Sequence, residues 1–219
     1  MKELEFPDSI IRAGNVIVLI DLKKKYCVKV LNPTQYKSIK LYFKFYKTQP
    51  QKIKEYLPEP ISLVKYDRMH FYIERLIDGV RYIPTLRNVF PMMKKIIKFT
   101  FLLSQENGKG YANNNLTYGN LILTKKGVKI IDWAFMKKSY PLIDFLTFSE
   151  SCYFYIFRDR NISNESLKFV NYVIYLIGRY RKGLKIKKRY MKEIVNEFLR
   201  KKSLHPSLQF RKIIKNKLF

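Results

Sequence analysis

A stretch of short polar residues set among strand-like apolar ones, from Gly110 to Asp132, constrains the fold more than any other part of the chain. Residues 121–123 and 128–131 are short apolar runs, and Thr124-Lys125-Lys126-Gly127 between them has a glycine near the turn, which is typical of a β-hairpin. Two β-rich runs and a helical run precede this stretch, and helical runs follow it. The order of segments favours an α+β fold.

The ends of this hairpin carry two oxygen-bearing side chains. Asn120 enters the first strand, and Asp132 leaves the second. Antiparallel pairing brings the beginning of one strand beside the end of the other, so we expect the amide and the carboxylate to be neighbours. Such a pair suits Mg²⁺, which prefers oxygen ligands and usually shares its shell with substrate phosphates.

The same stretch carries a resemblance. Asn115-Leu116-Thr117-Tyr118-Gly119-Asn120, followed by a strand, a turn and Ile131-Asp132-Trp133, resembles the catalytic loop and metal motif of the aminoglycoside phosphotransferase, choline kinase and lipopolysaccharide core kinase group. That group carries H-G-D-x-x-x-x-N followed by I-D-W or a variant. The resemblance implies ATP and Mg²⁺ as cofactors, with Asn120 and Asp132 as metal ligands. It also implies a two-lobed protein-kinase-like fold, with a small β-rich N-lobe over residues 1–79 and a helical C-lobe over residues 80–219.

The catalytic loop departs from the group's pattern at its front. Asn113-Asn114-Asn115 stands where the group has H-G-D, so the amide of Asn115 takes the place of the catalytic base. Phosphoryl transfer depends mostly on positioning and charge stabilisation, and a general base contributes roughly 10²- to 10⁴-fold. Asn115 can orient a hydroxyl but cannot take its proton. Slow transfer and nucleotide binding without transfer therefore both stay open.

Two β-branched runs, residues 15–22 and 26–31, predict a hairpin near the N-terminus. Cys27-Val28-Lys29-Val30 resembles the strand whose lysine holds the nucleotide α- and β-phosphates, which would give Lys29 that role. The alternative is an ordinary strand lysine that faces solvent. Upstream there is only Gly14 and no G-x-G-x-x-G pattern.

Residues 33–48 predict a helix, with Asn32 as N-cap and proline at its first position. In the resembled group a helix here supplies a glutamate that pairs with the strand lysine. No glutamate lies in this segment; Gln35 is the nearest polar substitute, and Glu55 and Glu59 come later in the chain. We therefore expect Lys29 to lack a carboxylate partner.

Residues 61–64 and 69–79 predict two further strands. The end of the second, Glu74 to Gly79, resembles the hinge strand whose backbone meets adenine, which makes Glu74 and Leu76 candidate nucleotide contacts. An ordinary turn at Asp78-Gly79 is the alternative.

A long apolar helix is expected from Pro84 or Thr85 to about Gln105, where glycines end it. Beyond the site, residues 140–146 resemble the group's D-P-x-x-D-L segment. We expect Asp144 to be structural, either bonding loop amides or capping a helix.

Charge points to an anionic partner. The 219 residues include 44 lysines and arginines against 17 acidic residues, which gives a net charge of +27. Such a charge favours an acidic glycolipid, a membrane face or nucleic acid as partner, and it would repel a cationic aminoglycoside. From Gly178 onward there are 15 basic residues against Glu193 and Glu197. Cys27 and Cys152 form no disulfide framework, and the N-terminus has no signal-like apolar run, so we expect a cytoplasmic protein, peripheral at the inner membrane surface.

The segment order most resembles the lipopolysaccharide core heptose kinases, so the expected function is ATP- and Mg²⁺-dependent phosphorylation of a sugar or glycolipid. Two alternatives remain. A pseudokinase would bind nucleotide or a partner without transfer, which Asn115 favours. A basic nucleic-acid-binding protein would use the positive charge together with the 17 tyrosines and 16 phenylalanines, since bases stack on aromatic faces.

Overall fold

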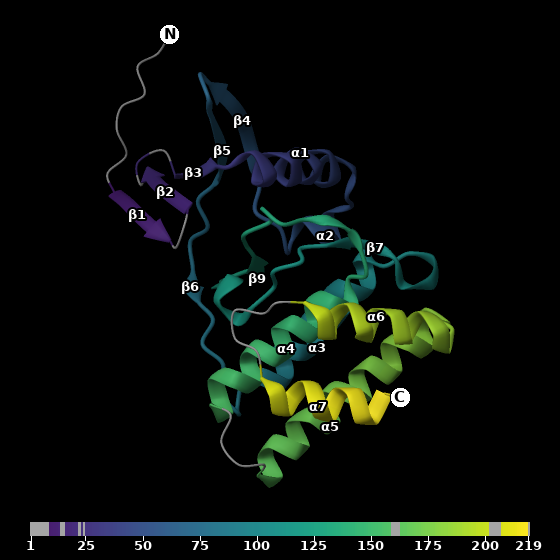
Figure 1. Ribbon diagram of the computed structural model, residues 1–219. Coiled ribbons are helices and arrows are strands. Elements are labelled where there is room, and N and C mark those ends of the chain that lie inside the picture. The colour runs from purple at the N-terminus through teal and green to yellow at the C-terminus, as the bar shows by residue number, and fades with distance from the viewer. Residues whose placement is uncertain are drawn as a thin grey trace. The chain divides into compact units, whose positions relative to one another are not determined.

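The computed structural model describes residues 9–13, 16–21, 23, 25–158, 163–201 and 207–218. The chain divides into two compact units (Figure 1). The first unit contains Met1–Val80 and Ile122–Met136, and the second contains Arg81–Leu121 and Lys137–Phe219. Within the described ranges, no helix has both the length and the apolar character needed to cross a membrane.

An antiparallel five-stranded sheet forms the body of the first unit, in the order β1-β2-β3-β5-β4. Its strands are β1 (Ser9–Ala13), β2 (Val16–Asp21), β3 (Tyr26–Leu31), β4 (Pro60–Tyr66) and β5 (Met69–Arg75). The strands predicted from residues 15–22, 26–31 and 61–64 are confirmed where they are described; Gly14, Asn15 and Leu22 lie outside the described residues. The strand predicted over 69–79 is present, but it ends at Arg75, before the turn at Asp78-Gly79. β3 lies at the centre of the sheet.

Helix α1 (Pro33–Thr48) follows β3 and has the boundaries expected from its cap. The Asn32 side chain accepts a hydrogen bond of 2.9 Å from the Gln35 backbone N–H, and the Gln35 side chain accepts one of 3.0 Å from the Asn32 N–H. This reciprocal capping box satisfies two backbone donors at the start of the helix. A short helix, α2 (Gln51–Lys54), comes next.

The returning segment of the first unit packs against α1 and the chain after it. The Trp133 indole stacks on Tyr42, with ring centroids 5.4 Å apart, and also on Phe45. The Ile130 N–H donates a 2.7 Å hydrogen bond to the Tyr56 carbonyl. Aromatic stacking and buried backbone hydrogen bonds thus hold residues 122–136 in this unit.

The predicted hairpin is present as β8 (Leu121–Thr124) and β9 (Gly127–Ile130), which adjoin the short β6 (Val80–Arg81) in a three-stranded sheet of order β6-β8-β9. Gly127 has a φ of 138°, a backbone conformation that side chains disfavour, so glycine is needed at this turn. The Thr124 hydroxyl completes the turn by donating to the Gly127 carbonyl and accepting from the Lys126 N–H.

Helix α4 (Leu142–Phe157) is the central element of the second unit, and residues 142–153 are all buried. The helices that pack against it are α3 (Val89–Leu103), α5 (Asn164–Gly183), α6 (Lys188–Arg200) and α7 (Leu208–Leu218). Strands β7 (Gly110–Ala112) and β10 (Lys137–Ser139) pair antiparallel, and two short 3₁₀ turns are η1 (Glu106–Gly108) and η2 (Tyr118–Asn120).

Helix α3 begins at Val89, later than the predicted start near residue 85, and it ends at Leu103. The Asn88 side chain explains the later start. Its carbonyl oxygen accepts from the Tyr82 hydroxyl and the Thr85 N–H, both at 2.9 Å, and its amide donates to the Ile83 carbonyl. These bonds hold residues 82–88 in a turn, because asparagine competes well with helical hydrogen bonding.

Candidate functional site

Lys29 lies on the central strand of the first unit and is joined to Glu74 on the neighbouring strand. The distance between Lys29 Nζ and Glu74 Oε1 is 2.7 Å, and the side chains are only 13% and 6% exposed. In the register of β3 and β5, Lys29 is opposite Tyr72 and Cys27 is opposite Glu74. Lysine and glutamate are therefore diagonal neighbours on one face of the sheet, a spacing that long side chains bridge.

The surroundings of Lys29 favour its charged form. Burial alone would lower the pKa of Lys29, but the Glu74 carboxylate, with a smaller contribution from Asp132, raises that pKa above its ordinary value. Burial and the Glu74 charge raise the pKa of the Cys27 thiol to about 11, so the thiol is neutral at physiological pH. The result is a fixed cation with two carboxylates acting on it, all within the first unit.

The expectation that Lys29 lacks a carboxylate partner is wrong. The partner comes from strand β5 and not from helix α1, because the sheet register places Glu74 within reach of Lys29. Gln35, the predicted substitute, uses its side chain in the capping box of α1.

The backbone at the end of β5 is already engaged within the first unit. The Leu76 N–H donates to the Lys25 carbonyl at 2.8 Å, and the Arg75 N–H donates to the Glu59 carbonyl at 2.9 Å. A contact between adenine and Glu74 or Leu76 stays a prediction, and the Leu76 N–H would have to exchange partners to donate to a base.

In the second unit, Asp144 organises the loop that follows β7. Its two carboxylate oxygens accept hydrogen bonds from the backbone N–H groups of Asn113, at 2.6 Å, and Asn114, at 2.7 Å. The prediction that Asp144 bonds loop amides is confirmed. Asn114 has a φ of 64°, and this bidentate acceptor holds the strained turn in place.

Two further bonds hold the loop between Asn113 and Asn120. The Asn113 side-chain oxygen accepts from the Asn115 N–H at 3.0 Å, and the Asn120 side-chain amide donates to the Asn115 carbonyl at 2.8 Å. Because Asn120 uses its nitrogen in this bond, its Oδ1 is the end of the amide suited to a cation. The loop is therefore ordered around Asn115 by its own side chains.

Helix α4 contributes a residue that the sequence patterns did not indicate. The Ser151 hydroxyl accepts from the Tyr118 N–H at 3.1 Å and donates to the Phe148 carbonyl at 2.8 Å. No local motif marks this serine, since its role arises from the packing of α4 under the loop.

Burial raises the pKa of Asp144 to about 6, against the opposing effects of Lys201 and of the Asn113 and Asn114 amides. At neutral pH Asp144 is thus a carboxylate, the form that can accept from two N–H groups at once. Lys201 had no predicted role, and its position near Asp144 depends on tertiary packing of α6 that no sequence motif marks.

Asp132 follows β9 in the first unit, with a left-handed φ of 62°. Asn120 belongs to the second unit, so the predicted pairing of the two as metal ligands stays a prediction. No cluster of three or more histidine, cysteine or acidic residues with metal-binding geometry occurs in the part of the chain that the structure describes. One carboxylate and one amide oxygen fit Mg²⁺ that takes its other ligands from water and phosphates, and do not fit a structural metal site.

Comparisons with known proteins support the fold. No protein-family model matches the sequence, and no curated protein matches it. Among solved structures the chain is similar to amicoumacin kinase hAmiN in complex with AMP-PNP, Ca²⁺ and Ami, with a TM-score of 0.54 and 10% sequence identity, over 96% of this chain and 89% of that one. The predicted α+β, two-lobed kinase-like fold is confirmed.

Proposed function

We propose that the protein is an ATP- and Mg²⁺-dependent phosphotransferase that acts on a sugar or glycolipid hydroxyl. The buried ion pair between Lys29 and Glu74 carries this proposal. A lysine on a central strand, fixed by one carboxylate and influenced by a second at Asp132, is an arrangement suited to holding nucleotide phosphates. The similar kinase structure contains a nucleotide analogue and a divalent cation, which supports the same reading.

In this proposal Lys29 holds the α- and β-phosphates, and Glu74 keeps the ammonium group in place. Asp132 and Asn120 are the residues that would hold Mg²⁺. When bound, the metal would offset the negative charge that develops on the phosphate oxygens. Glu74 and Leu76 would lie near the base.

Asn115 would position the acceptor hydroxyl. Its backbone is held on both sides, through the N–H by Asn113 and through the carbonyl by Asn120, so its side chain starts from a fixed point. Positioning is a large part of catalysis in phosphoryl transfer. An amide cannot accept the proton, so we expect slow transfer.

The neutral Asn115 also favours a second function, that of a pseudokinase which binds nucleotide without transferring phosphate. The missing helix glutamate had favoured the same alternative, but Glu74 on β5 supplies the carboxylate. The amide of Asn115 is therefore the feature that still favours a pseudokinase.

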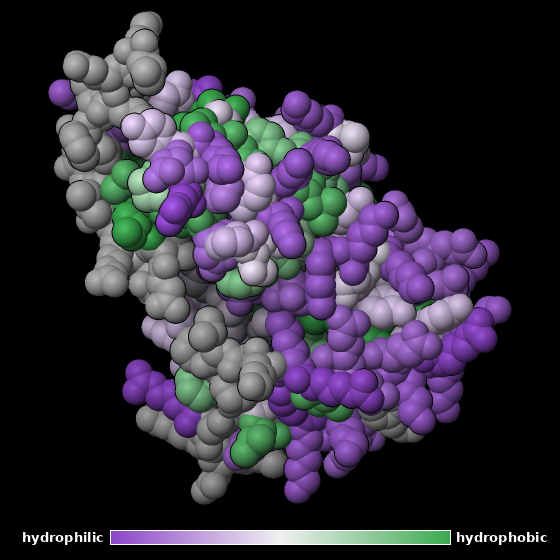
Figure 2. All heavy atoms as spheres, turned by 45° about the horizontal axis from the view of Figure 1, so that its top comes forward, coloured by the Kyte–Doolittle hydropathy of each residue, from purple (hydrophilic) through white to green (hydrophobic). Residues whose placement is uncertain are grey.

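The proposed acceptor is an anionic glycolipid of the lipopolysaccharide core type, reached from the cytoplasmic face of the membrane. The net charge of +27 supports this choice. Exposed basic side chains are dense where α5 ends and α6 begins: Arg181, Lys182, Lys185, Lys187, Lys188 and Arg189. Hydrophilic residues also cover much of the face seen in Figure 2. Nucleic acid is the less favoured partner, because many of the aromatic rings are buried in the core and do not face solvent.

Thermal unfolding with and without ATP and Mg²⁺ tests the nucleotide site. A ligand at a hundred times its dissociation constant adds about 2.7 kcal/mol to the free energy of unfolding. We expect this gain for the native chain and for Glu55→Ala, which removes an exposed acid from the same unit, and its loss in Lys29→Met and Asp132→Ala. An equal gain in all four chains, or none in the native chain, would overturn the proposed nucleotide site.

Transfer is tested separately with γ-labelled ATP and acceptor sugars. If the protein is a kinase, Asn115→Asp should raise the rate by roughly 10²- to 10⁴-fold, because it restores a base. If the native chain binds ATP but neither it nor Asn115→Asp transfers phosphate, the pseudokinase alternative is established.

A further inference from the structure

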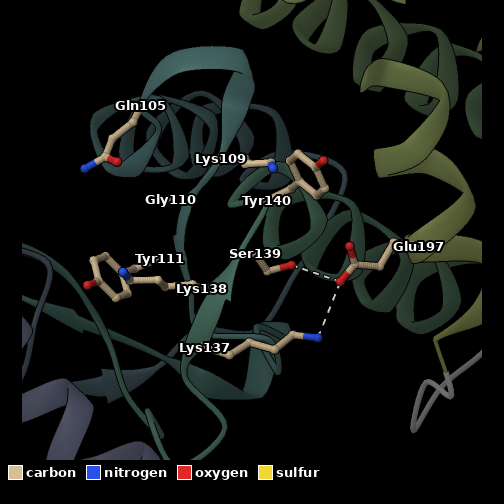
Figure 3. A pocket seen from close by; sticks show the side chains of 9 residues that line it. All are labelled: Gln105, Lys109, Gly110, Tyr111, Lys137, Lys138, Ser139, Tyr140 and Glu197. Carbon is tan, nitrogen blue, oxygen red and sulfur yellow. Dashed lines mark hydrogen bonds and ion pairs between the residues drawn. The ribbon is translucent and has the colours of Figure 1, made fainter. Parts of the chain in front are cut away.

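The second unit has a cavity of about 520 Å³ beside the β7–β10 pair. Its walls come from the turn after α3, from the two strands and the residue that follows β10, and from α6. Figure 3 shows the nine side chains that line it: Gln105, Lys109, Gly110, Tyr111, Lys137, Lys138, Ser139, Tyr140 and Glu197. None of them has a role in the proposed nucleotide site.

The backbone around the cavity is tightly built. The Gln105 N–H donates to the Lys109 carbonyl at 2.6 Å, which closes the turn that carries Lys109. A β-carbon added at Gly110 would lie 2.1 Å from the Leu103 carbonyl oxygen, so strand β7 runs in close contact with the end of α3. The wall that presents Lys109 is therefore fixed before any ligand arrives, which lowers the entropic cost of binding.

The cavity carries excess positive charge. Glu197 Oε1 lies 3.4 Å from Lys137 Nζ and accepts a 2.9 Å hydrogen bond from the Ser139 hydroxyl (Figure 3). Glu197 thus offsets one of the three lysines. Lys109 and Lys138 remain as two exposed cations of the cavity wall, the first beside Tyr140 and the second beside Tyr111 (Figure 3). None of the ion pairs between described residues includes either of them.

The other lining groups suit a polyhydroxylated body. Lys138 Nζ lies 5.9 Å from the centre of the Tyr111 ring, so an aromatic face adjoins the cationic side of the cavity. Gln105, Ser139 and Glu197 offer amide, hydroxyl and carboxylate groups, the usual partners of sugar hydroxyls. A purely apolar ligand would find little to bind here.

We propose that this cavity binds the phosphomonoester of a small hydroxylated molecule, such as a sugar phosphate. A phosphomonoester carries nearly two negative charges at neutral pH, which matches the two cations of Lys109 and Lys138. The sugar ring would lie against Tyr111, with its hydroxyls toward Gln105, which is on the same side of β7 (Figure 3). The site includes no residue assigned above to ATP, Mg²⁺ or the acceptor hydroxyl, so its ligand can be tested without nucleotide.

The test measures binding of inorganic phosphate and of glucose 6-phosphate, without Mg²⁺ and at constant ionic strength. Lys109→Gln combined with Lys138→Gln should weaken both ligands at least about tenfold, since charge-assisted hydrogen bonds are the strong ones. Lys168→Gln combined with Lys215→Gln removes two exposed charges from the same unit outside the cavity, and should leave binding unchanged. Lys29→Met should also bind normally.

Equal loss in the two double variants would show a general charge effect, and loss in Lys29→Met alone would place the phosphate in the first unit. Either result would overturn the proposal. Acetylation of the native chain gives a check that does not depend on a variant. Glucose 6-phosphate should slow modification of Lys109 and Lys138 severalfold, glucose should not, and equal rates with both ligands would contradict the site.

Discussion

The buried ion pair makes a sharp prediction about stability. Glu74→Gln leaves the Lys29 ammonium in a site that is only 13% exposed, without its 2.7 Å partner. Removing one member of a buried pair typically costs about 3–5 kcal/mol, because the remaining charge is uncompensated. Lys29→Met should cost a similar amount. The double variant should cost far less than the sum, since neither charge then remains.

A second ion pair of the first unit, between the last residue of β5 and the residue before β4, provides the control. Arg75 and Glu59 are 3.4 Å apart, but their side chains are 51% and 54% exposed. Exposed pairs contribute about 0–1 kcal/mol, so Glu59→Gln should change the free energy of unfolding by less than that. Urea denaturation of the native, single and double variants measures all of these values. If Glu74→Gln costs no more than Glu59→Gln, the reasoning about burial is refuted.

Three further predictions concern other parts of the fold. The pKa of Asp144 is about 6 in the folded protein, against an ordinary value of 3.8. Because the folded state binds this proton more tightly, protonation of Asp144 stabilises the fold fully below pH 3.8, and this stabilisation is lost as the pH rises through 6. The free energy of unfolding of the native chain should therefore fall by about 3 kcal/mol between these pH values relative to Asp144→Asn; parallel pH profiles would contradict this. Gly110→Ala should lower the free energy of unfolding by about 1–3 kcal/mol, because its β-carbon would meet the Leu103 carbonyl. Gly178→Ala, at an open position of α5, should instead raise it by about 0.5–1 kcal/mol. Thermal unfolding of both variants measures the difference, and equal effects would contradict it. Asn32→Ala should cost about 1 kcal/mol in urea denaturation by removing the cap of α1, and an unchanged midpoint would argue against the capping box.

Local chemistry made several elements predictable. Asn32 followed by proline marks the start of α1, and Gly127 marks the hairpin turn, because each satisfies a backbone requirement within a few residues. Asp144 was predictable in role through the resemblance, and its bonds to Asn113 and Asn114 confirm it. Short-range rules sufficed for these features.

Features that depend on long-range pairing were not predictable. The partner of Lys29 was sought in α1, but the register of β3 against β5 decides it, and Glu74 is 45 positions away in the sequence. The start of α3 depends on the hydrogen bonds that Asn88 makes with Tyr82 and Thr85, which compete with a helical pattern that otherwise extends to residue 85. In the first case strand pairing decides which residues meet, and in the second side-chain hydrogen bonds override the helical pattern.

The return of residues 122–136 to the first unit has a consequence for synthesis on the ribosome. Tyr42 and Phe45 emerge early, yet the ring that stacks on them, Trp133, is added only after residues 81–121 have been made. Until then the first unit lacks the partner for a buried aromatic surface, and closing so long a loop slows the last step of its folding. The first unit must therefore remain incomplete while residues 81–121 of the second unit are translated, so this is the interval in which a nascent chain would most need protection from aggregation.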